Sequence, residues 1–266
     1  MNGSGNDFII VDNRSQIFPE DDRPLLIRRL CQRQTGVGSD GLILLEDDSQ
    51  VDFSWRFYNA DGSEAEMCGN GGRCAARFAF LHGIAPERMV FRTLAGLIKA
   101  EIHGSQVKLQ LSSPGDIRQD ICLLIGDEEV VVDFINTGVP HVVIPVDDLS
   151  LCEVREKGRR IRFHDEFQPA GTNVNFISVV TPHELSIRTY ERGVEDETLA
   201  CGTGSVAASL AASARGLVVP PTRVVTRSGE VLTVYYQRER AGFTEVFLEG
   251  DAKIVYEGSI IREFLQ

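Results

Sequence analysis

The chain has 266 residues, a length that suits one large domain or two of medium size. Its composition, 42% hydrophobic and 25% charged, is typical of a globular protein, and its formal net charge is −12. Because nucleic acid and anionic membrane surfaces require a basic face, neither is expected as a partner.

The sequence shows no sign of a membrane segment or of a metal site. No apolar run approaches the roughly 20 residues that span a bilayer, and the N-terminal residues do not resemble a signal peptide. We therefore expect a cytoplasmic protein whose six cysteines remain thiols. The cysteines form no CxxC pair and have no histidine at ligand spacing, so no structural zinc site is predicted.

Short apolar or alternating runs predict mainly strands, with a few helices between them. In chain order we expect a strand at 8–11, a helix at 24–33, strands at 41–45 and 52–58, a helix at 72–81, strands at 108–111, 130–134, 141–146, 175–180 and 184–190, a helix at 205–214, and strands at 231–236 and 245–249. The last two helices are rich in alanine, which permits close packing against a sheet. This pattern predicts an α+β fold with antiparallel sheet.

One stretch near the middle of the chain predicts a domain boundary. Residues 112–115 (SSPG) combine the residue types that end regular structure. We expect an N-terminal domain over residues 1–112, completed by residues 254–266, and a C-terminal domain over residues 113–253.

An internal repeat is the most informative feature of the sequence. Residues 58–71 (YNADGSEAEMCGNG) and 190–204 (YERGVEDETLACGTG) both lead from a strand through an acidic loop to Cys-Gly-x-Gly and an alanine-rich helix. Their cysteines are Cys68 and Cys201. The repeat predicts two pseudo-symmetric α/β domains, each an antiparallel sheet wrapped around a central helix, with the active site in the cleft between them.

The repeated motif indicates proton transfer by two thiols. A cysteine at a helix N-terminus lies at the positive end of the helix dipole, which lowers the thiol pKa, and the following glycines leave N–H groups open to a carboxylate. Two such sites would place a thiol on each face of an amino-acid Cα. One thiolate would remove the proton and the opposite thiol would return one, because a single base returns the proton to the face it left.

The N–H groups would stabilise the charge that builds on the substrate carboxylate. No cofactor is implied, since the sequence has neither a Schiff-base lysine context nor a Rossmann fingerprint. A lone cysteine is more often a small buried hydrophobe, and this is the interpretation for the cysteines outside the repeat: Cys31, Cys74, Cys122 and Cys152.

At these motifs the sequence closely resembles diaminopimelate epimerase. The resemblance extends over nearly the whole chain, through residues 3–8 (GSGNDF), 36–41 (GVGSDG), 59–63 (NADGS), 67–74 (MCGNGGRC), 138–141 (GVPH), 172–176 (TNVNF), 190–193 (YERG) and 200–204 (ACGTG). It implies a homodimeric cytoplasmic enzyme that interconverts LL- and meso-diaminopimelate without pyridoxal phosphate or another cofactor. That reaction serves lysine and peptidoglycan-precursor synthesis. In the family the first cysteine is usually the proton donor and the second the acceptor, and the roles exchange in the reverse direction.

The resemblance also implies which residues bind the substrate. The backbone positions expected to hold the reacting carboxylate are Gly69, Asn70, Gly202 and Thr203. The side chains expected to hydrogen-bond other polar groups of the substrate are Asn6, Asn59 and Asn173.

Three further residues take roles from the resemblance. Arg192 is expected to hold the distal carboxylate, for which its fork of donors is well suited. Glu191 is expected to face an ammonium group and, together with His141, to tune the cysteines.

The sequence also departs from the family pattern. Gly41 stands where some members have a glutamine that touches the substrate. Val139 stands where many members have an asparagine that binds the distal end, so one polar contact is removed. The start lies only a few residues before Asn6, so we expect part of the family's first strand to be missing or the start to lie elsewhere.

Several alternatives compete with this interpretation. A proline or hydroxyproline racemase would use the same two thiols, but those enzymes have Cys-Gly-His where Asn70 follows Gly69 here, and they do not need Arg192. A histidine-type racemase is compatible with Val139. Phenazine-pathway isomerases lack the cysteine pair. A non-catalytic amino-acid-binding protein would gain nothing from two thiols, and a cysteine hydrolase would leave the second cysteine unexplained.

Overall fold

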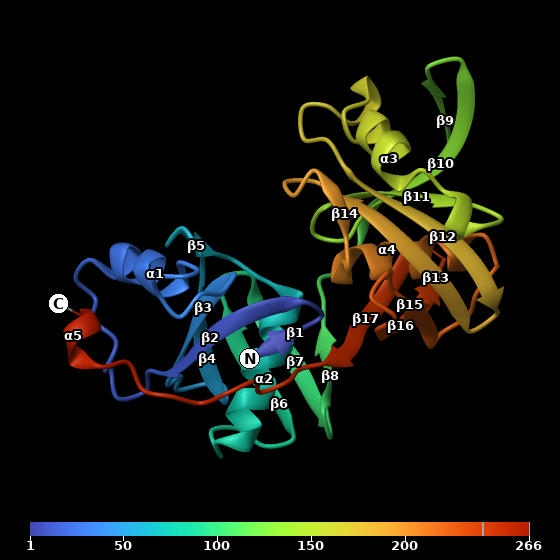
Figure 1. Cartoon of the computed structure of the whole chain (residues 1–266). Helices are drawn as coiled ribbons and strands as arrows, with labels where there is room; N and C mark the ends of the chain where they lie inside the picture. Colours follow the sequence, from blue (N-terminus) through green and yellow to red (C-terminus); the bar gives the residue numbers. More distant parts are fainter. Residues whose placement is uncertain (241, 266) are drawn as a thin grey trace. The chain divides into compact units, whose positions relative to one another are not determined.

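The structure is a computed structural model that describes residues 1–240 and 242–265 (Figure 1). The chain forms two compact units. Unit 1 comprises Met1–Leu109 together with Gly250–Gln266, and unit 2 comprises Gln110–Glu249. Among the described residues, no helix is long and apolar enough to cross a membrane.

Unit 1 is built around a mixed β-sheet. Its elements are β1 (Asn2–Gly3), β2 (Asn6–Asp12), α1 (Arg23–Cys31), β3 (Gly41–Glu46), β4 (Phe53–Asn59), β5 (Glu64–Ala65), α2 (Gly69–Leu81), β6 (Arg88–Thr93), β7 (Gly96–His103), β8 (Gln106–Gln110) and α5 (Arg262–Leu265). Most neighbouring strands pair antiparallel, but β2 with β3 and β4 with β6 pair parallel.

Helix α2 packs against the strands of unit 1. It contacts β1, β2, β3 and β7. The buried positions of α2 are mainly small residues, among them Gly71, Gly72, Ala75, Ala76 and Ala79. At Gly72 an added Cβ would lie 2.8 Å from Leu109 Cδ2, so the sheet approaches the helix closely here.

Unit 2 repeats this arrangement with a larger sheet. Its elements are β9 (Gly115–Ile125), β10 (Glu128–Asn136), β11 (Pro140–Pro145), η1 (Leu149–Leu151), α3 (Val154–Arg162), η2 (Asp165–Phe167), β12 (Asn173–Thr181), β13 (Glu184–Glu191), β14 (Asp196–Thr198), α4 (Gly202–Ala214), β15 (Thr222–Val225), β16 (Val231–Glu239) and β17 (Gly242–Asp251). Parallel pairs occur between β11 and β12 and between β13 and β15. The other pairs are antiparallel.

Helices α3 and α4 lie on opposite faces of strands β11 and β12. Val142 and Val174 belong to the core that includes α3. Val143 and Ile177 belong to the core that surrounds α4, a helix in contact with β10, β11, β12, β13, β15 and β16. Because side chains alternate along a strand, every second residue of β11 and β12 faces α4. The polar side chains of this set on β11 and β12 are His141, Asn173 and Asn175.

The α+β prediction is confirmed, with one difference in the sheets. They were expected to be antiparallel, but each contains parallel pairs because crossovers through helices join some neighbouring strands. Helix α3 was not predicted, because its segment VREKGRRIR is mostly charged and has a glycine at its centre. Its Gly158 packs against Tyr190, where an added Cβ would lie 2.5 Å from the Tyr190 Cβ.

Candidate functional site

Both cysteines of the repeat are the N-cap residues of the central helices. Cys68 precedes α2 and Cys201 precedes α4, and both have extended backbone conformation. The helices were expected to begin three residues later, at 72 and 205, but they begin directly after the cysteines. The first backbone hydrogen bond of α2 runs from Gly72 N to Cys68 O (2.7 Å), and that of α4 runs from Ser205 N to Cys201 O (2.9 Å). The earlier N–H groups of each helix therefore have no acceptor within the helix.

In unit 1 one of these N–H groups donates to the Cys68 sulfur. Gly71 N donates to Cys68 Sγ at 3.5 Å. Burial raises the pKa of the Cys68 thiol, although the N–H groups of Gly71 and Asn70 and the charge of Arg73 lower it. The side chain remains half-buried in this unit.

In unit 2 the Cys201 thiol is buried more deeply, with 8% of the residue exposed. Its Sγ lies 3.6 Å from Thr203 Oγ1. Burial, followed by the nearby Glu191, raises the pKa of Cys201 to about 12, against the lowering effects of Thr203 and Gly204. The expected lowering of the thiol pKa by helix position is thus present in both copies, but desolvation outweighs it.

The asparagines of unit 1 form one hydrogen-bonded chain beside Cys68. Asn70 Nδ2 donates to Asn6 Oδ1 (2.7 Å), and Asn6 Nδ2 donates to Asp40 Oδ2 (2.9 Å). At the other end Arg73 NH2 donates to Asn70 Oδ1 (2.9 Å) and to Ser4 Oγ (2.5 Å). The predicted binding residues Asn6 and Asn70 therefore orient one another.

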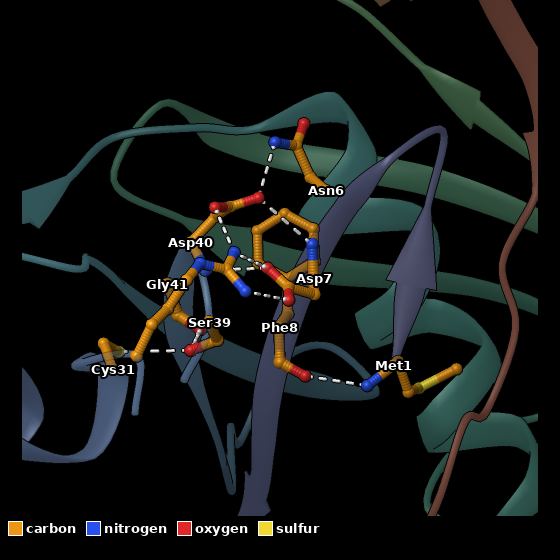
Figure 2. Close-up of polar contacts among 9 residues, drawn as sticks. Met1, Asn6, Asp7, Phe8, Cys31, Ser39, Asp40 and Gly41 are labelled. Atoms are coloured by element: carbon orange, nitrogen blue, oxygen red, sulfur yellow. Dashed lines mark hydrogen bonds and ion pairs between the residues drawn. The ribbon is translucent and has the colours of Figure 1, made fainter. Parts of the chain in front are cut away.

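Asp40 is itself held by an ion-pair network at the start of β2 (Figure 2). Arg33 bridges the carboxylates of Asp7 and Asp40, at 2.8 and 2.9 Å. Figure 2 shows the Asn6 and Asp40 side chains directed toward one another, with Asp7 N donating to the same Asp40 oxygen at 3.2 Å. Burial acts to raise the pKa of Asp7, but the contacts with Arg33 and Asp40 together hold it below its ordinary value.

Asn59 lies at the end of β4, where the chain turns. Its Nδ2 donates to Ser63 Oγ (3.1 Å), and Ser63 Oγ donates to Asp61 Oδ1 (2.6 Å). Asn59 is exposed to solvent. The turn thus fixes the Asn59 amide while leaving it accessible.

Gly41 pairs with Asn59 across β3 and β4. A Cβ at Gly41 would lie 2.6 Å from the Tyr58 carbonyl oxygen and 2.7 Å from Phe57 Cε2. These distances are below van der Waals contact, so this backbone has no room for a glutamine side chain at position 41. Glycine at position 41 is therefore compatible with the close packing of β4, and a larger residue is not.

In unit 2 the amide of Asn173 links two backbone segments. Asn173 Nδ2 donates to Pro140 O (3.1 Å), and Asn173 Oδ1 accepts from Arg192 N (2.9 Å). The guanidinium of Arg192 donates from NH1 to Ala170 O (2.9 Å). The structure therefore brings Asn173 and Arg192 together through the backbone, next to the loop that contains Val139.

Glu191 lies on β13, where it is opposite Asp196 of the antiparallel strand β14. Burial raises the pKa of its carboxyl, although the neighbouring Thr198 lowers it. The charge of Glu191 also acts to raise the pKa of Cys201. His141 lies on the same face of unit 2, on β11, and is fully buried.

Asn175 and Thr189, which were not predicted as site residues, form a buried polar cluster with His141. Asn175 Nδ2 lies 3.1 Å from His141 Nδ1, and Thr189 Oγ1 donates to Asn175 Oδ1 at 2.9 Å. The alternation of asparagines in TNVNF, which places Asn173 and Asn175 on one face of a strand, was the available signal. Nothing comparable marked Thr189, Arg33 or Asp40.

The other cysteines differ in burial. Cys31 and Cys74 are buried, as predicted, and burial raises the pKa of Cys74 to about 12. Cys122 is exposed and Cys152 is half-buried, so the prediction of a buried hydrophobe is wrong for Cys122. Its position at the outer side of β9 explains this, since alternate residues of that strand face solvent. Within the described residues, no group of three or more His, Cys, Asp or Glu side chains could hold a metal ion.

Comparison with known proteins identifies the family. The family model for diaminopimelate epimerase matches residues 1–115 and 134–255. The chain is 48% identical over 281 residues to a diaminopimelate epimerase of Aquifex aeolicus, covering 100% of this chain and 98% of that protein. It is 39% identical over 271 residues to one of Archaeoglobus fulgidus, covering 97% and 94% of the two chains.

Solved structures extend the comparison to the fold. A phenazine biosynthesis protein of the PhzF family from Bacillus anthracis superposes with a TM-score of 0.70 at 15% identity, covering 94% of this chain and 92% of that one. A hydroxyproline epimerase from Agrobacterium vitis gives a TM-score of 0.65 at 18% identity, covering 94% and 87%. These likenesses establish a shared two-domain fold, and the sequence relatives establish that the chain belongs to the diaminopimelate epimerase family.

Proposed function

We propose that the protein interconverts LL- and meso-2,6-diaminopimelate by proton transfer at one Cα, with Cys68 and Cys201 as the two acid–base groups. The observation that carries the proposal is the repeated cap: each central helix directly follows a cysteine, and the sulfur of Cys68 accepts from Gly71 N while that of Cys201 lies 3.6 Å from Thr203 Oγ1. The named relatives at 48% and 39% identity support the substrate. This reaction would supply precursors of lysine and peptidoglycan.

In the proposed reaction one cysteine is a thiolate and the other a thiol. The thiolate removes the Cα proton, which leaves the electron pair on carbon and, by resonance, on the adjacent carboxylate. The opposite thiol then donates its proton to the other face of the carbon and becomes the thiolate. The net change is inversion, and the reverse reaction uses the same groups in exchanged roles, so no co-reactant is consumed.

The helix N-termini would stabilise the charge that develops on the carboxylate. Gly69 and Asn70 in one unit, with Gly202 and Thr203 in the other, are the first residues of α2 and α4. Their N–H groups precede the first intrahelical bond, so they are available as donors without cost to the helix. Removing one such donor from an enzyme typically lowers kcat by about 10²-fold or more.

Specificity for the second amino-acid centre would come from the residues beyond the cysteines. We propose that Arg192 pairs with the distal carboxylate and that Asn6, Asn59 and Asn173 bind the remaining polar groups. Glu191 would face an ammonium group, and with His141 it would set the ionisation of the thiols. Val139 has no polar side-chain group to offer, so polar recognition of the distal end would rely on Arg192.

The decisive experiment incubates LL-diaminopimelate with the protein in deuterated buffer. Wild type should form meso product with deuterium at the inverted Cα, whereas Cys68→Ala and Cys201→Ala should each lose epimerisation by at least about 10³-fold. Cys122→Ala is the matched control, because that exposed thiol lies outside the repeat. Full epimerisation by either active-cysteine variant would contradict the two-base mechanism.

The same assay separates the alternatives. L-proline, hydroxyproline and L-histidine should show no Cα exchange if Arg192 selects a second carboxylate. Turnover of one of them in place of diaminopimelate would reassign the substrate, and binding without Cα exchange would indicate a binding protein.

We also propose a homodimer in the cytoplasm. Membership of the family supports both, and the six free thiols are compatible with a reducing compartment. Sedimentation equilibrium at assay concentrations should give twice the chain mass of 29.4 kDa. A monomeric mass with full activity would contradict the dimer.

A further inference from the structure

A buried polar relay crosses three neighbouring strands of unit 2. Thr189 on β13 pairs in register with Asn175 on β12, and β12 pairs with β11, which contains His141. The three side chains are 3%, 0% and 0% exposed, respectively. They lie on the sheet face toward α4, where an added Cβ at Gly204 would meet Asn175 Oδ1 at 2.5 Å. The relay therefore packs directly against the first turn after Cys201.

The orientation of the Asn175 amide follows from its contact with a backbone carbonyl group, which can only accept a hydrogen bond. Asn175 Nδ2 lies 2.9 Å from the carbonyl oxygen of Val142, which can only accept. The nitrogen must therefore be on that side. The amide oxygen then faces the Thr189 hydroxyl, which donates to it. A flipped amide would place two acceptors, Asn175 Oδ1 and Val142 O, against each other.

This orientation determines the tautomer of His141. One hydrogen of Asn175 Nδ2 is committed to Val142 O, and the other is directed to His141 Nδ1 at 3.1 Å. Nδ1 must accept, so a neutral ring carries its proton on Nε2. Within the described residues, His141 Nε2 is buried and has no hydrogen-bond partner. A buried N–H without an acceptor is unfavourable, which is typical of a group reserved for a ligand.

The surroundings of His141 keep the ring neutral. Burial, with a smaller contribution from the Arg192 charge, lowers the pKa of His141 to about 3. The other ionisable groups on this face of unit 2 include Glu191 and Cys201, together with Asp133 of β10, which lies opposite Val143 and pairs with Arg215 at 2.7 Å. At neutral pH the ring is therefore uncharged.

We propose that Asn175 is a positioning residue that holds His141 as a neutral Nε2–H donor, and that His141 serves the reaction by hydrogen-bonding an anionic acceptor rather than by shuttling a proton. The acceptor is a thiolate sulfur or a substrate carboxylate oxygen, both of which carry negative charge in the proposed mechanism. A neutral donor stabilises such charge without competing for the proton in transfer. This inference rests on the proposed function for the identity of the acceptor, but the tautomer itself does not.

The tautomer is tested first, on the whole wild-type protein without substrate. Uniform ¹⁵N labelling of histidine, with His141→Gln to assign the signal, should show Nε2 protonated and Nδ1 bare, unchanged between pH 6 and 9. A proton on Nδ1, or titration of the ring in this range, would overturn the proposal. Because no turnover is involved, this result stands even if the proposed substrate is wrong.

Variants then test the link to catalysis. In Asn175→Asp a carboxylate replaces the donor, so the ring proton should move to Nδ1 or a second proton should bind, and kcat should fall about 100-fold. Asn136→Asp is the matched control: its Oδ1 already accepts from Gly138 N at 3.0 Å, so it keeps its bond and should change neither the ¹⁵N pattern nor kcat by more than about threefold. A changed tautomer with unchanged kcat would overturn the positioning role.

Substitution at His141 distinguishes donor from base without relying on Asn175. The amide nitrogen of His141→Gln can occupy the position of Nε2, so it should retain more than about a tenth of wild-type kcat and the same pH profile, whereas His141→Phe should lose about 100-fold. Equal losses in both variants would overturn the donor role. Thermal unfolding of each variant would show whether it is folded.

Discussion

At the scale of single residues, the ionisation of Cys201 depends on a carboxylate from a neighbouring strand. Glu191 is the second contribution, after burial, to the raised pKa of this thiol, and it opposes the donors of the first helical turn. Burial also raises the pKa of Glu191 itself. The two groups therefore resist simultaneous ionisation, and a change at either alters the other.

This coupling predicts the behaviour of Glu191→Gln. Removing the negative charge should lower the pKa of Cys201, so the thiolate fraction at a fixed pH increases and alkylation by iodoacetamide accelerates. We expect about a fivefold or larger increase at pH 8, measured by mass spectrometry of the Cys201 peptide. Glu195→Gln is the control, since Glu195 pairs with Arg162, 3.1 Å away. Equal acceleration in both variants would contradict a specific effect of Glu191.

His141 makes the stability of the protein depend on pH. Its pKa in the folded state is about 3, below the ordinary value of 6.5, so the unfolded chain binds more protons between these two pH values. The free energy of unfolding should therefore fall as the pH decreases below 6.5, by about 1.4 kcal/mol per pH unit from this residue. Urea titrations at pH 7 and pH 5 should show a smaller loss for His141→Gln than for wild type. Equal losses would mean that His141 is not buried in the neutral form.

At the scale of elements, the two central helices have the same type of N-cap, a cysteine, but differ in the space beside it. A Cβ at Gly71 would meet Ile43 Cδ1 at 3.2 Å, the mobile end of a side chain. A Cβ at Gly204 would meet Asn175 Oδ1 at 2.5 Å and the Cys201 sulfur at 3.2 Å. The amide cannot retreat because it is held on both sides, by Val142 and Thr189.

This asymmetry predicts different tolerance at equivalent positions. Gly204→Ala should lower the free energy of unfolding by about 1–3 kcal/mol and lower kcat, because the clash displaces both Asn175 and Cys201. Gly71→Ala should change the free energy of unfolding by less than about 1 kcal/mol, since helix propensity offsets the mild contact. Thermal denaturation and the epimerase assay measure both effects. A Gly71 variant as unstable as the Gly204 variant would contradict the argument.

At the scale of the whole molecule, unit 2 is continuous in sequence and unit 1 is not. The ends of unit 2 meet, because Leu111 N donates to Val246 O at 2.9 Å. Unit 1 needs its C-terminal segment: Asn2 and Lys253 exchange two backbone bonds of 2.7 Å, and Arg77 donates to Ala252 O. Unit 2 is therefore an insertion into unit 1.

The insertion predicts how fragments fold. A fragment of residues 110–249 should unfold cooperatively in urea, because it retains its whole α4 core. A fragment of residues 1–109 should be markedly less stable than the same fragment joined to residues 250–265 by a short Gly-Ser linker. Circular dichroism during denaturation compares them. Non-cooperative unfolding of the 110–249 fragment would contradict its independence.

Some of this organisation was accessible from sequence because the signals are local. The cysteine caps, the alanine-rich helices and most strands follow from motif and periodicity, which depend on neighbours in the chain. Helix α3 was missed because its charged segment carries little hydrophobic signal and is held by packing against Tyr190 and the sheet. Parallel pairing was missed because it depends on crossovers between distant segments.

The sequence by itself determined that two thiols cap two equivalent helices, since a cap is made by residues adjacent in the chain. Only the tertiary structure decided how those thiols ionise and how the neighbouring side chains are oriented. Burial, which reverses the expected direction of the Cys201 pKa, is produced by strands far away in sequence. The tautomer of His141 likewise depends on Asn175 and Val142, which the sheet register brings together. Desolvation and hydrogen-bond orientation are properties of the packed interior, and no local pattern encodes them.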